Sequence, residues 1–325
     1  MTFQSLRRQD FLDEESFRNT LLHLEAAELS YREQIREARK APGEFASTLR
    51  FMAADRWAAF QLRYTAGDSL TELAQSLTAV VEAFEDYVEE NEGKPDRDYA
   101  APFRMHDMVD TYIDYLHLIC VSILLHREDL IPRIHGLVEG TDYDGVDAVI
   151  EDLLQFFLPD RPEPDEWFWN KPYRTLLDAI DAETSAEQSK LMKKYVRGWY
   201  PALKGKAAFW GQHERIKPEF SPYFGYWTMC AAAFSYLYDI DDSSYRDEIV
   251  YPKDMVDYAR SMPRRPAKLE DGQQIFRVVG GHACPRDEKW FSPAKADSLR
   301  HFRKGEIMPT FDASEYGLTI WQWSA

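Results

Sequence analysis

The chain has 325 residues, enough for one large domain or two ordinary ones to bury a substantial core. Its 39 lysine and arginine residues face 56 aspartate and glutamate residues, which gives a formal net charge of −17. This excess disfavours binding to nucleic acid or anionic lipid and favours a cationic partner. An acidic composition also aids solubility, so charge alone leaves a purely solubilising role open.

The cysteines and the apolar runs indicate a cellular compartment. Cys120, Cys230 and Cys284 lie far apart and are odd in number, so a secreted disulfide framework is not expected. The first residues turn acidic before any apolar stretch develops, unlike a secretory signal. The sequence also contains no run of about twenty apolar residues, the length that a membrane span needs. We therefore expect a cytoplasmic protein with no membrane partner.

The N-terminal part predicts three amphipathic helices, because apolar residues recur there at steps of three and four. We place them at residues 11–40, 44–66 and 69–90. Gly67 suits the end of the second helix. Ser69 and Glu72 have the spacing of a capping box at the start of the third.

The middle of the chain predicts a central helix at residues 103–125, where the sequence is apolar along a broad face. A polar loop at residues 89–98 precedes it, and shorter helices are expected at 128–137 and 145–158. The segment 159–166, rich in proline and acidic residues, is expected to be a surface connection. A further helical pattern runs from about Tyr173 toward Trp199.

The last part predicts a buried helix at residues 223–237, a turn rich in caps at 239–244 and a final helix opened by Pro252. Beyond residue 263 two β-prone pieces, 274–279 and 318–323, are separated by glycines and prolines. The predicted fold is mainly α, a multi-helix antiparallel bundle or array with a small β-rich C-terminal appendage. We expect an N-terminal helical domain at 1–190, a C-terminal helical domain at 191–262 and a β-rich module at 263–325.

Acidic residues supply two candidate contact surfaces for a cationic partner. The first is a block on one side of the predicted third helix, where carboxylates crowd at steps of three and four: Glu82, Glu85, Asp86, Glu89 and Glu90. The second is the proline-stiffened loop that contains Glu163, Asp165 and Glu166. For both sets the alternative is an ordinary solvated face.

A third set of candidates combines aromatic and acidic residues in the last helical part. Tyr226 and Trp227 belong to an aromatic string, and such residues serve either as interface anchors or as core. Asp239, Asp241 and Asp242 either face a basic groove on a partner or cap the following helix.

Enzyme chemistry finds weaker support. His282, Cys284 and His301 suggest a metal site or a Cys–His pair, but a structural zinc site normally needs four ligands with paired spacing. Gly280–Gly281 lacks the pattern of a nucleotide-binding loop, and no nucleophile elbow is present. We expect no catalytic residues, no metal and no cofactor, and keep a Cys/His-dependent enzyme in the C-terminal module as the alternative.

Several strings of residues resemble a known family. Ala208-Phe-Trp-Gly-Gln-His213, Tyr223-Phe-Gly-Tyr-Trp227, Asp239-Ile-Asp-Asp-Ser-Ser244 and Tyr251-Pro-Lys-Asp254 resemble the C-terminal domain of the PoNi immunity proteins, which neutralise PoNe polymorphic nuclease toxins. Arg63-Tyr-Thr-Ala-Gly-Asp-Ser-Leu70 is similar to a signature of the same family's N-terminal helical domain. Together the resemblances cover about residues 11–259.

This resemblance implies an all-α fold and a binding function. The expected partner is a cognate toxin, a basic nuclease domain encoded by the adjacent gene, whose active or substrate cleft the acidic surface occludes. The alternatives are a toxin that is not a nuclease, and a helical scaffold or adaptor that has no toxin. The tail beyond residue 263 lies outside the pattern.

Overall fold

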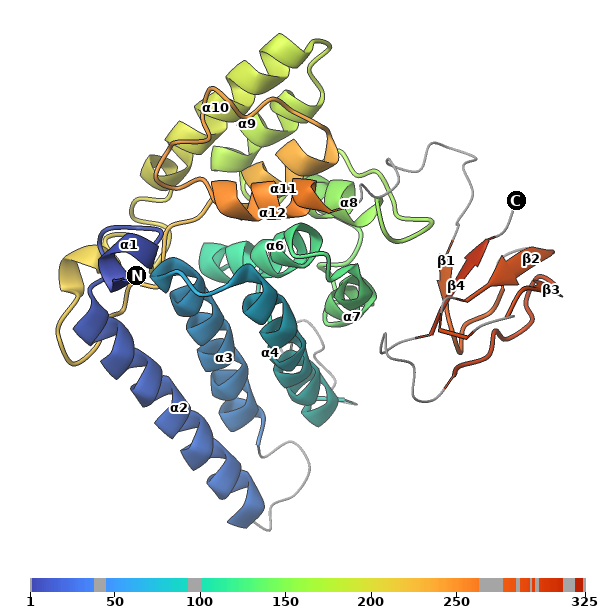
Figure 1. Ribbon diagram of the computed structural model, residues 1–325, viewed down its shortest axis with the longest axis horizontal. Helices are drawn as coiled ribbons and strands as arrows, with labels where there is room; N and C mark the ends of the chain where they lie inside the picture. Colours follow the sequence, from blue (N-terminus) through green and yellow to red (C-terminus); the bar gives the residue numbers. More distant parts are fainter. Residues whose placement is uncertain are drawn as a thin grey trace. The chain divides into compact units, whose positions relative to one another are not determined.

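The computed structural model describes residues 2–37, 45–92, 101–262, 277–284, 287–292, 294–295, 298–311 and 319–323. Contacts group the chain into two compact units, Met1–Arg265 and Pro266–Ala325. The first unit is helical and the second contains a small sheet (Figure 1). The predicted fold class, mainly α with a small β-rich C-terminal part, is confirmed.

The first unit begins with a short helix and three long ones that lie side by side (Figure 1). They are α1 (Phe3–Leu6), α2 (Glu14–Glu37), α3 (Ala46–Ala66) and α4 (Leu70–Glu90). These bounds confirm the three predicted helices, although the predicted ends at Lys40 and Glu44 and most of the loop at 89–98 lie outside the described residues.

Glycine ends α3 as predicted. Gly67 has a φ of 103°, and its N–H donates to the carbonyls of Arg63 and Tyr64. A Cβ at this position would collide with the backbone of Leu6. The predicted capping box is wrong, because Ser69 occupies the N-cap of α4 but its side chain makes no capping hydrogen bond.

Helix α6 (Val109–Leu124) lies at the centre of the core, as predicted. Thirteen of its sixteen residues are buried, and it packs against α7 (Ile131–Gly136), α8 (Ala148–Leu154), α11 (Met229–Leu237) and α12 (Lys253–Ser261). It begins later than predicted, although Phe103 is buried against Phe84 and Tyr115. Within the described ranges, no helix has both the length and the apolar character needed to cross a bilayer.

The helical pattern predicted from Tyr173 to Trp199 is two helices, α9 (Asn170–Ile180) and α10 (Ser185–Ala202), which pack against each other. Thr184 begins the second, because its Oγ1 accepts a hydrogen bond from the N–H of Glu187 at 3.3 Å. Residue 190 therefore lies inside α10, so a domain boundary there divides a helix. We accordingly propose only the boundary near residue 263.

The helix predicted at residues 223–237 is wrong in its first part, because only α11 is helical and residues 223–228 are not. Gly225 has a φ of 117°. Side chains from the N-terminal part hold this segment: Thr65 Oγ1 donates to the Phe224 carbonyl at 2.7 Å, and Gln9 Nε2 donates to the Tyr226 carbonyl at 2.7 Å. The periodicity of apolar residues along the chain carries no information about such long-range hydrogen bonds.

The second unit contains a four-stranded antiparallel sheet in the order β1-β4-β2-β3, built from β1 (Arg277–Val279), β2 (Glu288–Phe291), β3 (Arg300–Phe302) and β4 (Ile320–Trp323). Its core is small and aromatic, with Trp290, Phe302 and Trp321 buried. The predicted β-prone pieces contain β1 and β4, whereas residues 274–276 and 318 lie outside the described ranges. Strands β2 and β3 were not predicted, because each is too short to show a clear alternation of apolar and polar residues in the sequence.

Candidate binding surfaces

One side of α4 carries an exposed row of carboxylates. Glu82, Asp86 and Glu89 are exposed and recur at steps of four and three, so they share a face of the helix. None of the three forms a salt bridge with another residue that the structure describes. The last turn of α4 contains no basic residue, and the C-terminal end of a helix is itself partially negative. The row is compensated only in part, by the electrostatic attraction between Glu82 and Arg133 and by Arg32 and Arg36, which line the same groove as Asp86 and Glu89.

Glu85 lies between these residues but is used inside the fold. Arg133 of α7 donates to both of its carboxylate oxygens, from Nε at 2.8 Å and from Nη2 at 2.5 Å. The Glu85 carboxylate, by this hydrogen bonding, raises the pKa of Arg133. Glu85 thus joins α4 to α7 and leaves the other three carboxylates as the open part of the acidic row.

The connection at residues 159–166 lies at the surface, as predicted, and Glu163, Asp165 and Glu166 are exposed. The backbone holds it at one end, where the Ala148 N–H donates to the carbonyl of Glu166 at 2.8 Å. The other end is held by Arg161, whose guanidinium donates to Glu151. Both ends of the loop are therefore anchored, and the loop exposes three carboxylates.

A partly buried network supports that loop and was not apparent from the sequence. Arg161 Nη2 also donates to Asp144 at 2.7 Å, and His135 lies 3.0 Å from the same carboxylate oxygen. Burial by itself would raise the pKa of Asp144, but the hydrogen bonds from Arg161 and His135 outweigh it and lower the pKa to about 2. Asp144 is therefore ionised and neutralised within the fold.

The three aspartates at 239–242 have different environments. Asp239 is exposed, in a left-handed backbone conformation. Asp241 is exposed and accepts hydrogen bonds from the Ser243 N–H at 3.0 Å and hydroxyl at 2.9 Å, and the backbone bond chiefly lowers its pKa. Asp241 thus shapes the turn.

Asp242, by contrast, is buried and neutralised inside the protein. Only 3% of the residue is exposed. Its carboxylate accepts a hydrogen bond from Arg260 at 2.9 Å, contacts Arg246 at 3.3 Å and accepts a bond from the Tyr251 hydroxyl at 3.1 Å. The charge of Asp242 is compensated within the fold and contributes little to the electrostatic potential of the outer surface.

Tyr226 and Trp227 are part of the core, with exposed fractions of 3% and 4%. The Tyr226 hydroxyl accepts a hydrogen bond from the His213 N–H at 3.0 Å. The Trp227 indole donates to Thr65 Oγ1 at 2.9 Å. Of the two roles that the sequence left open, the structure supports core packing, and both residues line a cavity described below.

Segments that carried the family resemblance meet in one joint. The Tyr64 hydroxyl donates to Asp254 at 2.7 Å, and Arg8 Nε donates to the same carboxylate at 2.5 Å. Thr65 meets Phe224 and Trp227. The motif residues therefore hold the N-terminal helices to the segment before α11 and to the start of α12. In the sequence, these motif residues belong to three separate strings that carry the family resemblance. That resemblance was the signal that could have identified them.

The residues of the enzyme alternative differ in exposure. Cys284 is buried in the small core of the second unit, whereas His282 and His301 are exposed. Across the part of the chain that the structure describes, no group of three His, Cys, Asp or Glu residues is arranged to hold a metal ion. The buried environment of Cys284 differs from the exposed, electropositive surroundings that activate a cysteine nucleophile.

The fold and its surfaces define a mainly helical protein with exposed acidic faces. Residues 145–255 match the family model described as PoNe immunity proteins (PoNi), C-terminal. The C-terminal part of the predicted resemblance is thereby confirmed. The signature at residues 63–70 lies outside the matched segment and stays a prediction.

A solved structure shares the fold. The crystal structure of protein PA2201 from Pseudomonas aeruginosa superimposes with a TM-score of 0.62 over 78% of this chain and 91% of that chain, at 20% sequence identity. At this identity the likeness concerns the fold alone. A comparison with curated proteins gave no match.

Proposed function

We propose that this chain is a cytoplasmic immunity protein that binds a cognate polymorphic toxin and covers its active or substrate-binding cleft. The observation that carries the proposal is the family match at residues 145–255. We further propose that the toxin is a nuclease, in particular a DNase, as the resemblance implies. Such a cleft is basic because it binds phosphates, so an acidic protein surface is its natural complement.

The acidic row on α4 is the surface that fits this role best. Glu82, Asp86 and Glu89 are exposed and free of salt bridges to the residues described, whereas Glu85 and Asp242 are neutralised internally. Asp86 and Glu89 also line an open groove between the ends of α2, α3 and α4. A toxin loop that enters this groove would meet both carboxylates, beside Arg32 and Arg36 on the α2 side of the groove.

The charges contribute mainly to the rate of capture. Complementary potentials raise association rates by roughly ten to a thousandfold at low ionic strength, and salt screens this effect. Affinity rests instead on a few well-packed anchors at the centre of the interface. A fast rate matters for a protein that must meet the toxin before the toxin acts.

The experiment combines co-purification, protection and kinetics. The chain is expressed with the product of the adjacent gene, and association is measured at low and high salt for the wild type and for a triple variant, Glu82→Lys, Asp86→Lys and Glu89→Lys. We expect the variant to associate at least tenfold more slowly at low salt and to lose most of its salt dependence.

A matched triple variant, Glu163→Lys, Asp165→Lys and Glu166→Lys, makes the same change of charge on the loop. If only this second variant slows association, the toxin binds the loop and not α4. If the neighbouring product neither co-purifies nor loses toxicity in the presence of the wild type, the immunity function is refuted and a scaffold role remains. An unchanged rate in both variants refutes electrostatic capture alone.

A further inference from the structure

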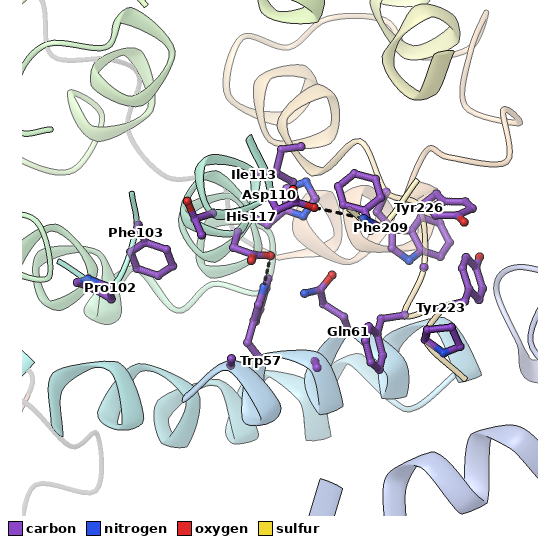
Figure 2. A pocket seen from close by; sticks show the side chains of 18 of the residues that line it. Trp57, Gln61, Pro102, Phe103, Asp110, Ile113, His117, Phe209, Tyr223 and Tyr226 are labelled. Atoms are coloured by element: carbon purple, nitrogen blue, oxygen red, sulfur yellow. Dashed lines mark hydrogen bonds between the residues drawn. The ribbon is translucent and has the colours of Figure 1, made fainter. Parts of the chain in front are cut away.

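A cavity of about 270 Å³ lies inside the first unit, between α3, α6 and the segment that precedes α11 (Figure 2). Trp57 and Gln61 reach into it from α3, while Asp110 and His117 line it from α6. Neither the acidic row on α4 nor the loop at 163–166 contributes to its lining. The cavity therefore needs an explanation of its own.

Its principal polar group is the carboxylate of Asp114. The Trp57 Nε1–H donates to this carboxylate at 2.8 Å, the bond drawn at Trp57 in Figure 2. Asp114 is half-buried and lines the cavity, and Gln61 also hydrogen-bonds to its carboxylate. Burial raises its pKa to about 7, and the neighbouring carboxylate of Asp110 adds to the increase. Arg50 also lines the cavity but forms no salt bridge with Asp114 in the described structure.

A second polar group, His117, lacks a partner. Its residue is only 6% exposed, and its ring makes no hydrogen bond to any residue in the described ranges. Burial lowers the pKa of His117 to about 3, so the ring is neutral at physiological pH. A neutral imidazole offers one donor and one acceptor. The ring nitrogens keep some access to the cavity, so a ligand bound there can form hydrogen bonds with them.

Aromatic side chains form much of the remaining lining. Trp199 is stacked with the His117 ring at a centroid distance of 6.5 Å and with Phe209 at 5.8 Å. Trp57 and Tyr226 also line the cavity. The faces of such rings attract cations, more strongly where water is excluded.

We propose that this cavity binds a guanidinium group, held by the carboxylate of Asp114 and the imidazole of His117 between aromatic walls. A guanidinium supplies the missing positive charge, N–H donors for both groups and a planar face that stacks on aromatic rings. An anionic ligand is disfavoured by Asp110 and Asp114. The volume lies just below the range of about 300 to 1,000 Å³ usual for drug-sized ligands, so the bound group is small.

The guanidinium has two sources, a free small molecule or an arginine side chain of a protein partner. The chemistry recognised by the cavity is the same for both. The inference does not rest on the proposed immunity function, because it uses only the residues that line the cavity.

The test uses calorimetric titration of the full chain with N-butylguanidinium, and with N-butylurea as a neutral molecule of the same shape. We expect saturable binding of the guanidinium and none of the urea. Asp114→Asn keeps an acceptor for Trp57 but removes the charge, and should weaken binding roughly tenfold or more. Asp178→Asn removes a partly exposed carboxylate of α9, outside the cavity lining, and should leave binding unchanged.

The pH dependence gives a second readout that needs no variant. Asp114 must be ionised to hold the cation, so binding should weaken by roughly tenfold or more from pH 8 to pH 5.5 and release protons near pH 7. The other titratable or charged groups that face the cavity are Asp110, His117, Arg50, Tyr223 and Tyr226. His117 titrates well below this window, and burial raises the pKa values of both tyrosines above it.

Three results would overturn the proposal: no saturable binding of N-butylguanidinium, equal binding of N-butylurea, or binding that is unaffected by both Asp114→Asn and pH. The source is then settled by competition. If the product of the adjacent gene displaces bound N-butylguanidinium, the natural group is an arginine side chain. If that product binds without displacement, or does not bind, the ligand is a free small molecule.

Discussion

The indole of Trp227 donates a hydrogen bond to the hydroxyl of Thr65 at 2.9 Å, although 162 positions of sequence separate the two residues. Thr65 in turn donates to the carbonyl of Phe224. Gly225 lies between these two contacts with a φ of 117°. The joint fixes a non-helical segment against α3, and this segment forms one wall of the cavity.

Gly225→Ala should destabilise the protein severely. An added Cβ would collide with the Thr65 hydroxyl and the Trp227 indole, and the left-handed backbone adds about 1 kcal/mol of its own. We expect a loss of about 3 kcal/mol in the free energy of unfolding, measured by urea denaturation. Gly205→Ala is the matched control, since its φ is 72° but nothing lies near the new Cβ. Equal losses in both variants would show that the joint tolerates the methyl group.

Asp242 and its neighbour Asp241 should differ sharply in their effect on stability. Asp242→Ala leaves Arg260 without its buried partner and should cost about 3 kcal/mol in the free energy of unfolding. Asp241→Ala removes only an exposed turn contact and should cost less than about 1 kcal/mol. Thermal unfolding of both variants checks this. Similar losses would mean that Arg246 and Arg260 do not depend on the Asp242 charge.

Periodicity predicted the long helices because each has a continuous apolar stripe that it buries locally. It failed at residues 223–228, where apolar and aromatic residues also recur but the backbone is held by Gln9 and Thr65 from far away in the sequence. It also merged α9 with α10, since the cap at Thr184 is a local signal within a stretch that otherwise reads as helical.

The acidic candidates were identified by composition, which does not distinguish an open carboxylate from a neutralised one. Asp242 and Glu85 have arginine partners that are distant or on another helix, so only the structure separates them from Asp86 and Glu89. The cavity around Asp114 was not predicted at all. Three of its polar residues, Asp110, Asp114 and His117, lie within the apolar sequence of α6, where they resemble ordinary interruptions.

Removal of the second unit should leave the first intact. Each unit has a hydrophobic core of its own, and the boundary lies near residue 265. A chain that ends at Arg265 should therefore keep its helical circular dichroism and unfold cooperatively at nearly the same midpoint as the helical transition of the full chain. Aggregation or loss of cooperativity in the shortened chain would contradict the proposed boundary near residue 263.

Asp114→Asn should stabilise the protein at high pH and not at low pH. Burial raises the pKa of Asp114 from 3.8 to about 7, so the folded state holds a proton that the unfolded state has released between these values. Stability of the wild type therefore falls as pH rises from about 4 to 7, and the asparagine variant escapes this loss. Relative to the wild type, the variant should gain roughly 3 kcal/mol in the free energy of unfolding between pH 4.5 and pH 8. Asp147, whose pKa burial raises to about 6, is common to both proteins and cancels in the difference. Urea denaturation at the two pH values measures the gain. A difference that does not change with pH would show that Asp114 is ionised throughout, and that its charge is already compensated within the protein.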